Sequence, residues 1–417
     1  MRVALLPAER EEEISRRVKR KRAAKIVAVL LVLVVAFTLF FAIVLNVNSL
    51  GVGRGNTDGA YGTVLADIEG ITDADPRIID IAMLGAHDAN TASLEPGNPI
   101  DDNPKSDVFE QLYPVSAGFQ YRMSVTQTVS PYELLMQGVR FVHLKYTYYD
   151  NDWYASHSII GRKFEEDVKD VLRFLADHHH RGEVVVLLFQ STWFGEDQSL
   201  HTFHDWLEGV TLDGKSIYDY VHYDKVNVFD SEFAEEGRVR MRDLRYNAVT
   251  ESGTSAGVVL LDRREDLPQA ETEKSAHSDY FFDVDSTLAH QWHSRMGEDV
   301  LAEEIDDYVF EVRAQSLYRW KLRVNQTQAS LSVESVGDVL RDIGAWLLVK
   351  FAEDYNLSLL ENEDFDEWLR VLPVFQVDFA NSDKGDFNRR VNEKIRARNE
   401  EIVRTLIAEN GNYEKLY

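Results

Sequence analysis

The stretch Ile81-Ala82-Met83-Leu84-Gly85-Ala86-His87-Asp88-Ala89-Asn90-Thr91 runs from an apolar segment into a turn of small residues that carries an imidazole beside a carboxylate. A strand of an α/β barrel presents its polar groups in this way, at its C-terminal end. His87 can exchange protons near neutral pH, and Asp88 can orient or charge-match a neighbouring group. Such a pair on its own more often marks a capped turn than a catalytic dyad, so the rest of the chain must decide.

From about residue 76 onward, apolar strand-like segments alternate with amphipathic helix-like segments. We expect strands at residues 78–84, 139–146, 152–156, 183–190, 257–261, 322–326 and 372–379, and helices at 164–179, 200–210, 336–352 and 387–409. Apolar strands covered by helices indicate a parallel sheet that is buried on both faces. No glycine-rich phosphate loop follows any strand, so the pattern predicts an α/β fold of the closed or nearly closed β/α barrel type rather than a doubly wound sheet.

The charge of the chain is strongly asymmetric. The 417 residues carry a formal net charge of -26, yet residues 1–48 hold nine basic and only four acidic residues, which leaves the remainder near -31. This field argues against nucleic acid as a partner, and it also opposes docking on anionic lipid. The chain has no cysteine, which excludes disulfides and mildly favours a bacterial cell surface over a eukaryotic extracellular space.

The first 75 residues divide into three segments by composition. Residues 1–25 end in a basic cluster, residues 26–45 are apolar apart from Thr38, and residues 46–75 are rich in Gly, Asn, Thr and Asp. About 20 apolar residues suffice to cross a hydrocarbon core, and no good signal-peptide cleavage site follows them. We therefore expect a cytoplasmic N-terminus at 1–25, a transmembrane signal-anchor helix at 26–45, a flexible linker at 46–75 and a folded domain at 76–417 outside the membrane.

Polar residues stand at the ends of the expected strands, which share one mouth in a barrel. In chain order they are His87, Asp88, Lys145, His157, Gln190, Arg263, Gln326 and Asp378. This set suits acid–base phosphoryl transfer that needs no metal or other cofactor. One histidine would take a hydroxyl proton, the other would protonate the leaving oxygen, and a lysine or arginine would stabilise the phosphate.

Five segments together resemble the successive barrel strands of the bacterial-type phosphatidylinositol-specific phospholipase C X-domain family. They are residues 81–91, 137–145, 153–157, 183–188 and 375–379, and their order and spacing match over about residues 75–390. The resemblance implies a distorted TIM barrel. It also implies a metal-independent reaction in which the inositol 2-hydroxyl attacks the phosphodiester and releases diacylglycerol and a cyclic inositol phosphate.

The resemblance also implies roles for single residues. By position, His87 would be the general base, oriented by Asp378. His157 would be the general acid, coupled to Asp88. Arg263 and Gln326 fall where the family contacts the inositol, and Gln190, which stands at a strand end, is a further expected substrate contact.

Two positions depart from the family pattern. The family's second strand usually ends in Asp-x-Arg, and its arginine clamps the phosphate, whereas this chain has His143 and Lys145. Lysine keeps the charge but lacks the bidentate fork. The family's acid histidine is usually followed by glycine, and here Ser158 follows His157. Eukaryotic relatives bind calcium at the end of the second strand, and His143 with Lys145 argues against calcium there.

Two other histidine groups in the sequence offer possible metal ligands. His178-His179-His180 fits a solvated helix end better, because consecutive residues of a helix point in different directions. The segment His290-Gln291-Trp292-His293, with Asp283 and Asp285 nearby, has only loose spacing.

The leading hypothesis is a membrane-anchored phosphodiesterase that acts on a phospholipid or glycolipid phosphodiester outside the cell. Two alternatives stay open. One is a catalytically impaired barrel that serves as a surface binding domain. The other is a metal-dependent glycerophosphodiester phosphodiesterase, which should place several carboxylates around His87.

Overall fold

The computed structural model describes residues 61–103, 117–118, 120–177, 182–194, 198–223, 239–245, 255–263, 275–293, 298–328 and 348–416, with scattered residues between 16 and 35. The expected transmembrane helix at 26–45 lies mostly outside the described residues. Of that segment, residues 27, 29–33 and 35 are helical and exposed. Among the described residues, no helix has the length and apolar character needed to cross a membrane.

Eight parallel strands form the centre of the fold, in the order β7-β6-β5-β2-β1-β10-β9-β8. They are β1 (Met83–Ala86), β2 (Val139–Tyr149), β5 (Val184–Trp193), β6 (Gly257–Asp262), β7 (Phe281–Asp283), β8 (Leu288–Trp292), β9 (Leu322–Gln326) and β10 (Val374–Val377). The outermost strands β7 and β8 are consecutive in the chain, and α8 (Val284–Thr287) joins and contacts both. The sheet therefore curls in the manner of a TIM barrel, as the sequence predicted.

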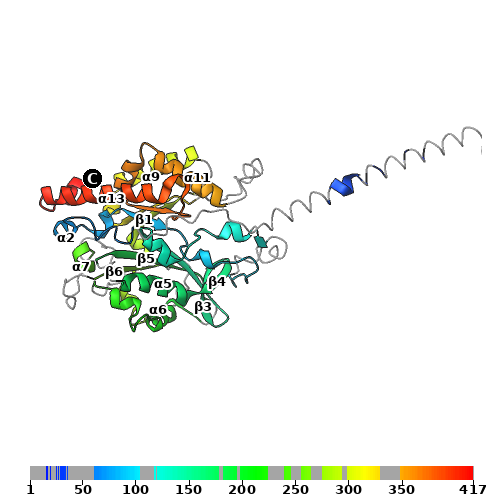
Figure 1. Cartoon of the computed structure of the whole chain (residues 1–417), viewed down its shortest axis with the longest axis horizontal. Coiled ribbons are helices and arrows are strands. Elements are labelled where there is room, and N and C mark those ends of the chain that lie inside the picture. The colour runs from blue at the N-terminus through cyan, green and yellow to red at the C-terminus, as the bar shows by residue number, and fades with distance from the viewer. Residues whose placement is uncertain are drawn as a thin grey trace, which may run out of the picture.

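An antiparallel hairpin extends β2 beyond the parallel strands. It consists of β3 (Asp152–His157) and β4 (Ile159–Lys163), and β3 pairs with the far end of β2. This hairpin lies at the opposite end of the molecule from α2 (Ile71–Ala74) and α7 (Met241–Arg245) (Figure 1).

Alternation along the strands separates two apolar cores, because successive strand residues point to opposite faces. One core lies between the strands and the helices and includes Leu84, Val142, Leu187, Leu260 and Phe375. The other, called the inner core below, lies inside the curled sheet and includes Met83, Phe141, Val186, Val259 and Val374.

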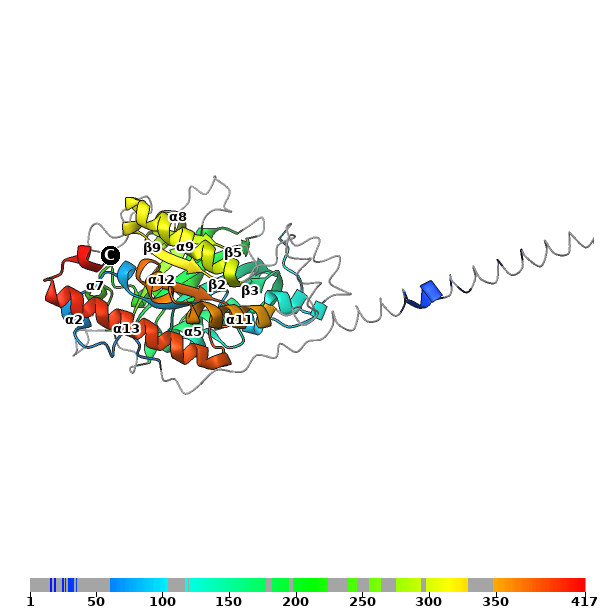
Figure 2. The ribbon, with the colours of Figure 1, turned by 90° about the horizontal axis from the view of Figure 1, so that it is seen from above.

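Helices cover the outer face of the curled sheet. α5 (Phe164–Ala176) and α6 (Leu200–Gly209) lie on one side of the strands, and α9 (Glu298–Ala314), α11 (Leu348–Glu361) and α13 (Phe387–Ala408) lie on the other (Figure 1). α13 runs along one side of the molecule in the view of Figure 2. Further helices in the described part of the chain are α4 (Pro131–Met136), α12 (Phe365–Val371) and the 3-10 turns η1 (Ile78–Asp80), η2 (Thr91–Ser93), η5 (Ile217–Tyr220), η6 (Ser278–Tyr280), η7 (Ser316–Trp320), η10 (Lys384–Asp386) and η11 (Tyr413–Leu416).

Residues 61–75 belong to the folded unit rather than to a flexible linker. Leu65, Ile68 and Ile71 are buried in the inner core. The buried Glu183 carboxylate accepts the N–H groups of Leu65 at 2.9 Å and Ala66 at 2.6 Å. The expected domain start at residue 76 is therefore wrong by at least 15 residues, because this polar, glycine-containing segment bonds to Glu183 and packs in the inner core. The linker before residue 61 lies outside the described residues.

The expected strands at 139–146, 183–190, 257–261, 322–326 and 372–379 correspond to β2, β5, β6, β9 and β10, and the strand at 152–156 to β3. The helices expected at 164–179, 200–210 and 387–409 correspond to α5, α6 and α13. The helix at 336–352 lies outside the described residues as far as residue 347. Residues 78–84 divide into η1 and β1 rather than forming one strand, and the Arg77 and Asp80 side chains pair at 2.7 Å across the η1 turn. No expected element covered β7, β8, α9 or α12.

Candidate active site

Several strands end in polar residues on the inward face of the sheet. The inward position after β1 is His87, β2 contributes His143 and Lys145, β5 contributes Gln190, and the position after β10 is Asp378. Each stands an even number of residues after an apolar residue of the inner core, so the strand period directs all of them to the same side. Parallel strands bring their C-terminal ends together, and this is why residues so far apart in sequence meet.

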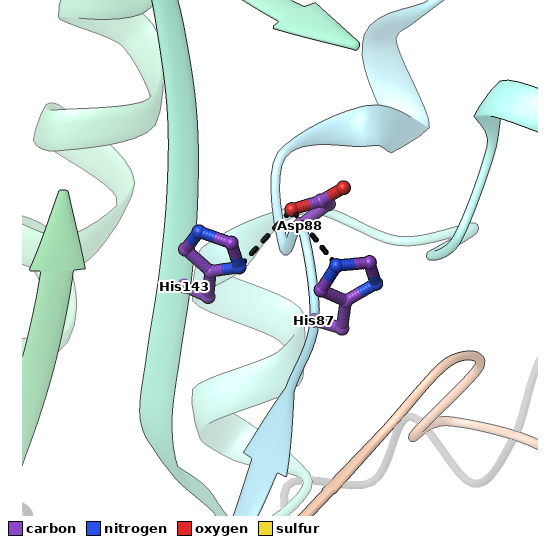
Figure 3. Close-up of side chains that lie close together, drawn as sticks. All are labelled: His87, Asp88 and His143. Carbon is purple, nitrogen blue, oxygen red and sulfur yellow. Dashed lines mark ion pairs between the residues drawn. The ribbon is translucent and has the colours of Figure 1, made fainter. Parts of the chain in front are cut away.

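Asp88 is the centre of this group and is fully buried. Its Oδ1 lies 3.4 Å from His87 Nε2 and 3.1 Å from His143 Nδ1 (Figure 3). Its Oδ2 lies 2.9 Å from Lys145 Nζ and 3.5 Å from His157 Nδ1. Burial by itself would raise the pKa of Asp88, but the three imidazoles and the ammonium group together hold it well below its usual value. Asp88 is therefore ionised, and its negative charge is stabilised by the surrounding side chains.

His87 is held at both its ring and its backbone. Its Nδ1 lies 2.8 Å from Oδ1 of the buried Asp378, and its carbonyl accepts hydrogen bonds from Thr126 Oγ1 at 3.0 Å and Gln127 Nε2 at 3.1 Å. Burial raises the pKa of Asp378, and the adjacent His87 opposes that rise. With Nδ1–H donated to the carboxylate, a neutral His87 has its lone pair on Nε2. This is the arrangement that a proton acceptor needs.

His157 ends β3 and faces His87, with 6.4 Å between the two ring centroids. Its Nδ1 donates a hydrogen bond to the Ser124 carbonyl at 2.7 Å, which leaves Nε2 to exchange a proton. Burial first, and then the positive charge of Lys145, lower the pKa of His157 to about 4, although 28% of its side-chain surface is accessible. Ser158 adopts φ 63°, so it makes the left-handed turn that glycine makes at lower cost.

His143 is the site residue to which the sequence analysis gave no role. It is buried, its Nε2 lies 2.9 Å from Gln190 Oε1, and its ring centroid is 5.4 Å from that of His87. Burial lowers its pKa to about 4. The alternation of Phe141, His143 and Lys145 on one face of β2 was a signal that could have placed it here.

Asn90 links the turn after β1 to β2, and sequence reasoning also missed it. Its Nδ2 donates to the Lys145 carbonyl at 2.7 Å, and its Oδ1 accepts the Lys145 N–H at 3.2 Å. These two hydrogen bonds fix the position of the Lys145 backbone next to the turn that carries Asp88. Asn90 is buried and also contacts the Asp167 carboxylate at 3.3 Å.

The remaining predicted site residues stand at the same ends of their strands. Gln326 ends β9, with Gln376 and Trp292 as its neighbours in the sheet, and Arg263 follows β6, where its N–H donates to the Phe189 carbonyl at 3.1 Å. Their assignment as substrate contacts, like the catalytic role of each residue above, stays a prediction.

Of the residues that could bind a metal, His87, Asp88 and His143 are the group in the described part of the chain that offers three ligand atoms within 4.8 Å of one another. The loosely spaced set near His290 is not gathered in this way. Asp283 accepts the Ser286 N–H as a helix cap, and His293 faces Glu304. The run at His178 lies outside the described residues.

No protein-family model matches the sequence, and no curated protein matches it either. Solved structures do match the fold. The F249X mutant of the phosphatidylinositol-specific phospholipase C from Staphylococcus aureus superposes with a TM-score of 0.50 at 13% identity, over 80% of this chain and 99% of that chain. A structure from work on the modulation of membrane binding by the S. aureus enzyme gives a TM-score of 0.50 at 12% identity, over 81% and 97% of the two chains. The expected resemblance in fold is confirmed.

Proposed function

Because the chain shares the fold of bacterial phosphatidylinositol-specific phospholipases C, we propose that it is a phosphodiesterase that cleaves an inositol phospholipid or a related glycolipid phosphodiester by acid–base chemistry. The observation that carries the proposal is the pair of histidines around Asp88. His87 is oriented by Asp378 at 2.8 Å, and His157 stands across from it with ring centroids 6.4 Å apart. One phosphodiester can reach both rings.

In the proposed reaction, His87 Nε2 takes the proton of the substrate hydroxyl, and the hydroxyl oxygen attacks phosphorus. The bond from phosphorus to the leaving oxygen breaks, and His157 Nε2 gives its proton to that oxygen. From phosphatidylinositol the products are a cyclic inositol phosphate and diacylglycerol. Lys145 supports the charge on the phosphate, but it already contacts Asp88 at 2.9 Å, so it serves both groups.

His157 must carry a proton to act as the acid. Its low pKa disfavours that proton in the absence of substrate. A phosphodiester carries a negative charge, and an opposite charge within about 4–6 Å favours the protonated imidazole. Substrate binding would therefore supply the acid form that the step needs.

The test is an assay of the full chain in detergent micelles with phosphatidylinositol and a metal chelator. We expect release of cyclic inositol phosphate, and we expect His87→Ala to lower kcat/KM by about 10³-fold or more. The matched control is His222→Ala, because His222 is also partly buried but bonds the Ala256 carbonyl at 2.9 Å, away from the cluster. Truncation at residue 76 would be a poor starting point, since it removes the buried Leu65.

The alternatives predict different outcomes in the same assay. A chain that is inert toward phosphatidylinositol, glycosylated inositol lipids and soluble phosphodiesters would favour a surface binding domain. Loss of activity with the chelator would favour a metal-dependent glycerophosphodiester phosphodiesterase. Among the described residues, the carboxylates seen in contact with His87 are Asp88 and Asp378, fewer than that alternative expects.

We further propose that residues 26–45 anchor the chain with its N-terminus in the cytoplasm and the barrel outside, at a bacterial cell surface. The basic residues before position 26 and the apolar run after it support this orientation. In intact cells, added protease should digest the barrel but spare an epitope tag at the N-terminus. Protection of the barrel would contradict the proposal.

A further inference from the structure

Two imidazole nitrogens and one carboxylate oxygen of the site lie close together. His87 Nε2 lies 3.4 Å and His143 Nδ1 lies 3.1 Å from the same atom, Asp88 Oδ1 (Figure 3). Asp88 Oδ1 and His143 Nδ1 are both buried, and in the described part of the chain neither makes a hydrogen bond to a group outside this cluster. Buried polar atoms in folded proteins are nearly always satisfied, so this point calls for a positively charged or hydrogen-bonding occupant.

The other nitrogen of each ring is already engaged. His87 Nδ1 lies 2.8 Å from Asp378 Oδ1, and His143 Nε2 lies 2.9 Å from Gln190 Oε1. A neutral imidazole has a single N–H, and in the tautomer that donates it to these outward acceptors it lies on the far side of each ring. The lone pairs of both rings then face Asp88.

We propose that His87 Nε2, Asp88 Oδ1 and His143 Nδ1 bind one divalent transition-metal ion of the zinc class. Ligands at about 2.0–2.2 Å from such an ion lie about 3.0–3.5 Å from one another, and the 3.1 Å and 3.4 Å separations fall in this range. Two imidazoles and one carboxylate suit zinc or cobalt, whereas calcium prefers oxygen ligands. Asp378 and Gln190 are the outer partners that typically orient metal-binding histidines.

The charges around the site accommodate an added cation. Asp88 and Asp378 contribute two carboxylates, and Lys145 is the one ammonium group seen in contact with them in the described part of the chain. Lys145 holds the opposite oxygen of Asp88, so it competes for the charge of that carboxylate without blocking Oδ1. His157 also approaches that opposite oxygen, but its Nδ1 donates to a backbone carbonyl.

Metal binding and proton abstraction exclude each other at His87, because both use the Nε2 lone pair. The ion would therefore inhibit the metal-free reaction proposed above. Binding itself does not depend on that reaction, and it can be measured without substrate.

The experiment titrates the full chain, freed of metal with a chelator, with Co²⁺ followed by visible absorption and with Zn²⁺ followed by calorimetry. We expect one ion per chain and a ligand-field band from cobalt. His143→Gln should weaken binding by about 100-fold or more while the circular dichroism spectrum is retained. The matched control changes two histidines of the run at residues 178–180: in the double variant His178→Gln/His180→Gln, affinity should stay unchanged.

A second variant keeps the test decisive if His143→Gln does not fold. Lys145→Met removes the competing cation and should tighten binding by about tenfold, a gain that misfolding cannot produce. The proposal is overturned if the wild-type chain binds no ion, if Lys145→Met does not tighten binding, or if the double variant abolishes binding. Binding by a chain that cleaves no phosphodiester would sink the proposed function and leave the metal site standing.

Discussion

The buried ion pair between Arg140 and Glu183 should control the stability of the end of the barrel at which β2 and β5 begin. Arg140 Nε lies 2.7 Å from Glu183 Oε2, and the two side chains are 1% and 0% exposed. The Arg140 Nη atoms also donate to four backbone carbonyls, two of them in residues 61–62. Glu183→Gln would leave the guanidinium buried without its counter-charge and would weaken the bonds to Leu65 and Ala66.

Loss of one partner from a buried pair costs about 3–5 kcal/mol of unfolding free energy, because the remaining charge stays desolvated. Arg389 and Glu393 provide the matched control. Their atoms lie 2.8 Å apart, almost the same distance, but the side chains are 51% and 57% exposed. Glu393→Gln should therefore lower the unfolding free energy far less than Glu183→Gln does. Equilibrium denaturant unfolding of the full chain, followed by tryptophan fluorescence, measures both values. Equal costs for the two variants would refute the reasoning.

Four further predictions concern the site and its support. Asp88→Asn should lower kcat/KM by about 10²-fold or more in the phosphodiesterase assay, because the lysine and the imidazoles lose their shared anion. Inorganic phosphate should raise the pKa of His157 above its value of about 4, and histidine NMR would show a rise, or refute it by an unchanged titration. Burial, opposed by the neighbouring Arg162, raises the pKa of Asp167 to about 7, so the contribution of this carboxyl to stability should be fully present below about pH 4 and should be lost as the pH rises to 7, a slope that Asp167→Asn should flatten. Gly138→Ala should cost at least about 2 kcal/mol in thermal unfolding, because Gly138 has φ 95° and a Cβ would lie 2.1 Å from Asn392 Oδ1.

Local patterns predicted the regular elements whose sequences repeat at the period of a strand or a helix. β9 and α13 were found to within one residue because Leu322 and Val324 alternate with polar residues in β9 and α13 has a sustained apolar face. β7 and β8 were missed because three and five residues, separated by a single turn of helix, give no period to recognise.

The sequence by itself determined that His87 and Asp88 end a buried strand and that a second histidine and a second carboxylate end others. The family resemblance implied that His87 pairs with Asp378, and the two meet across 291 positions of the chain. Only the tertiary structure showed that His143 and Lys145 also contact Asp88. Strand register sets these pairings, and register depends on the whole curled sheet rather than on any local pattern. The same reason hid the contact of residues 65–66 with Glu183, 118 positions away, which turned an apparent linker into part of the fold.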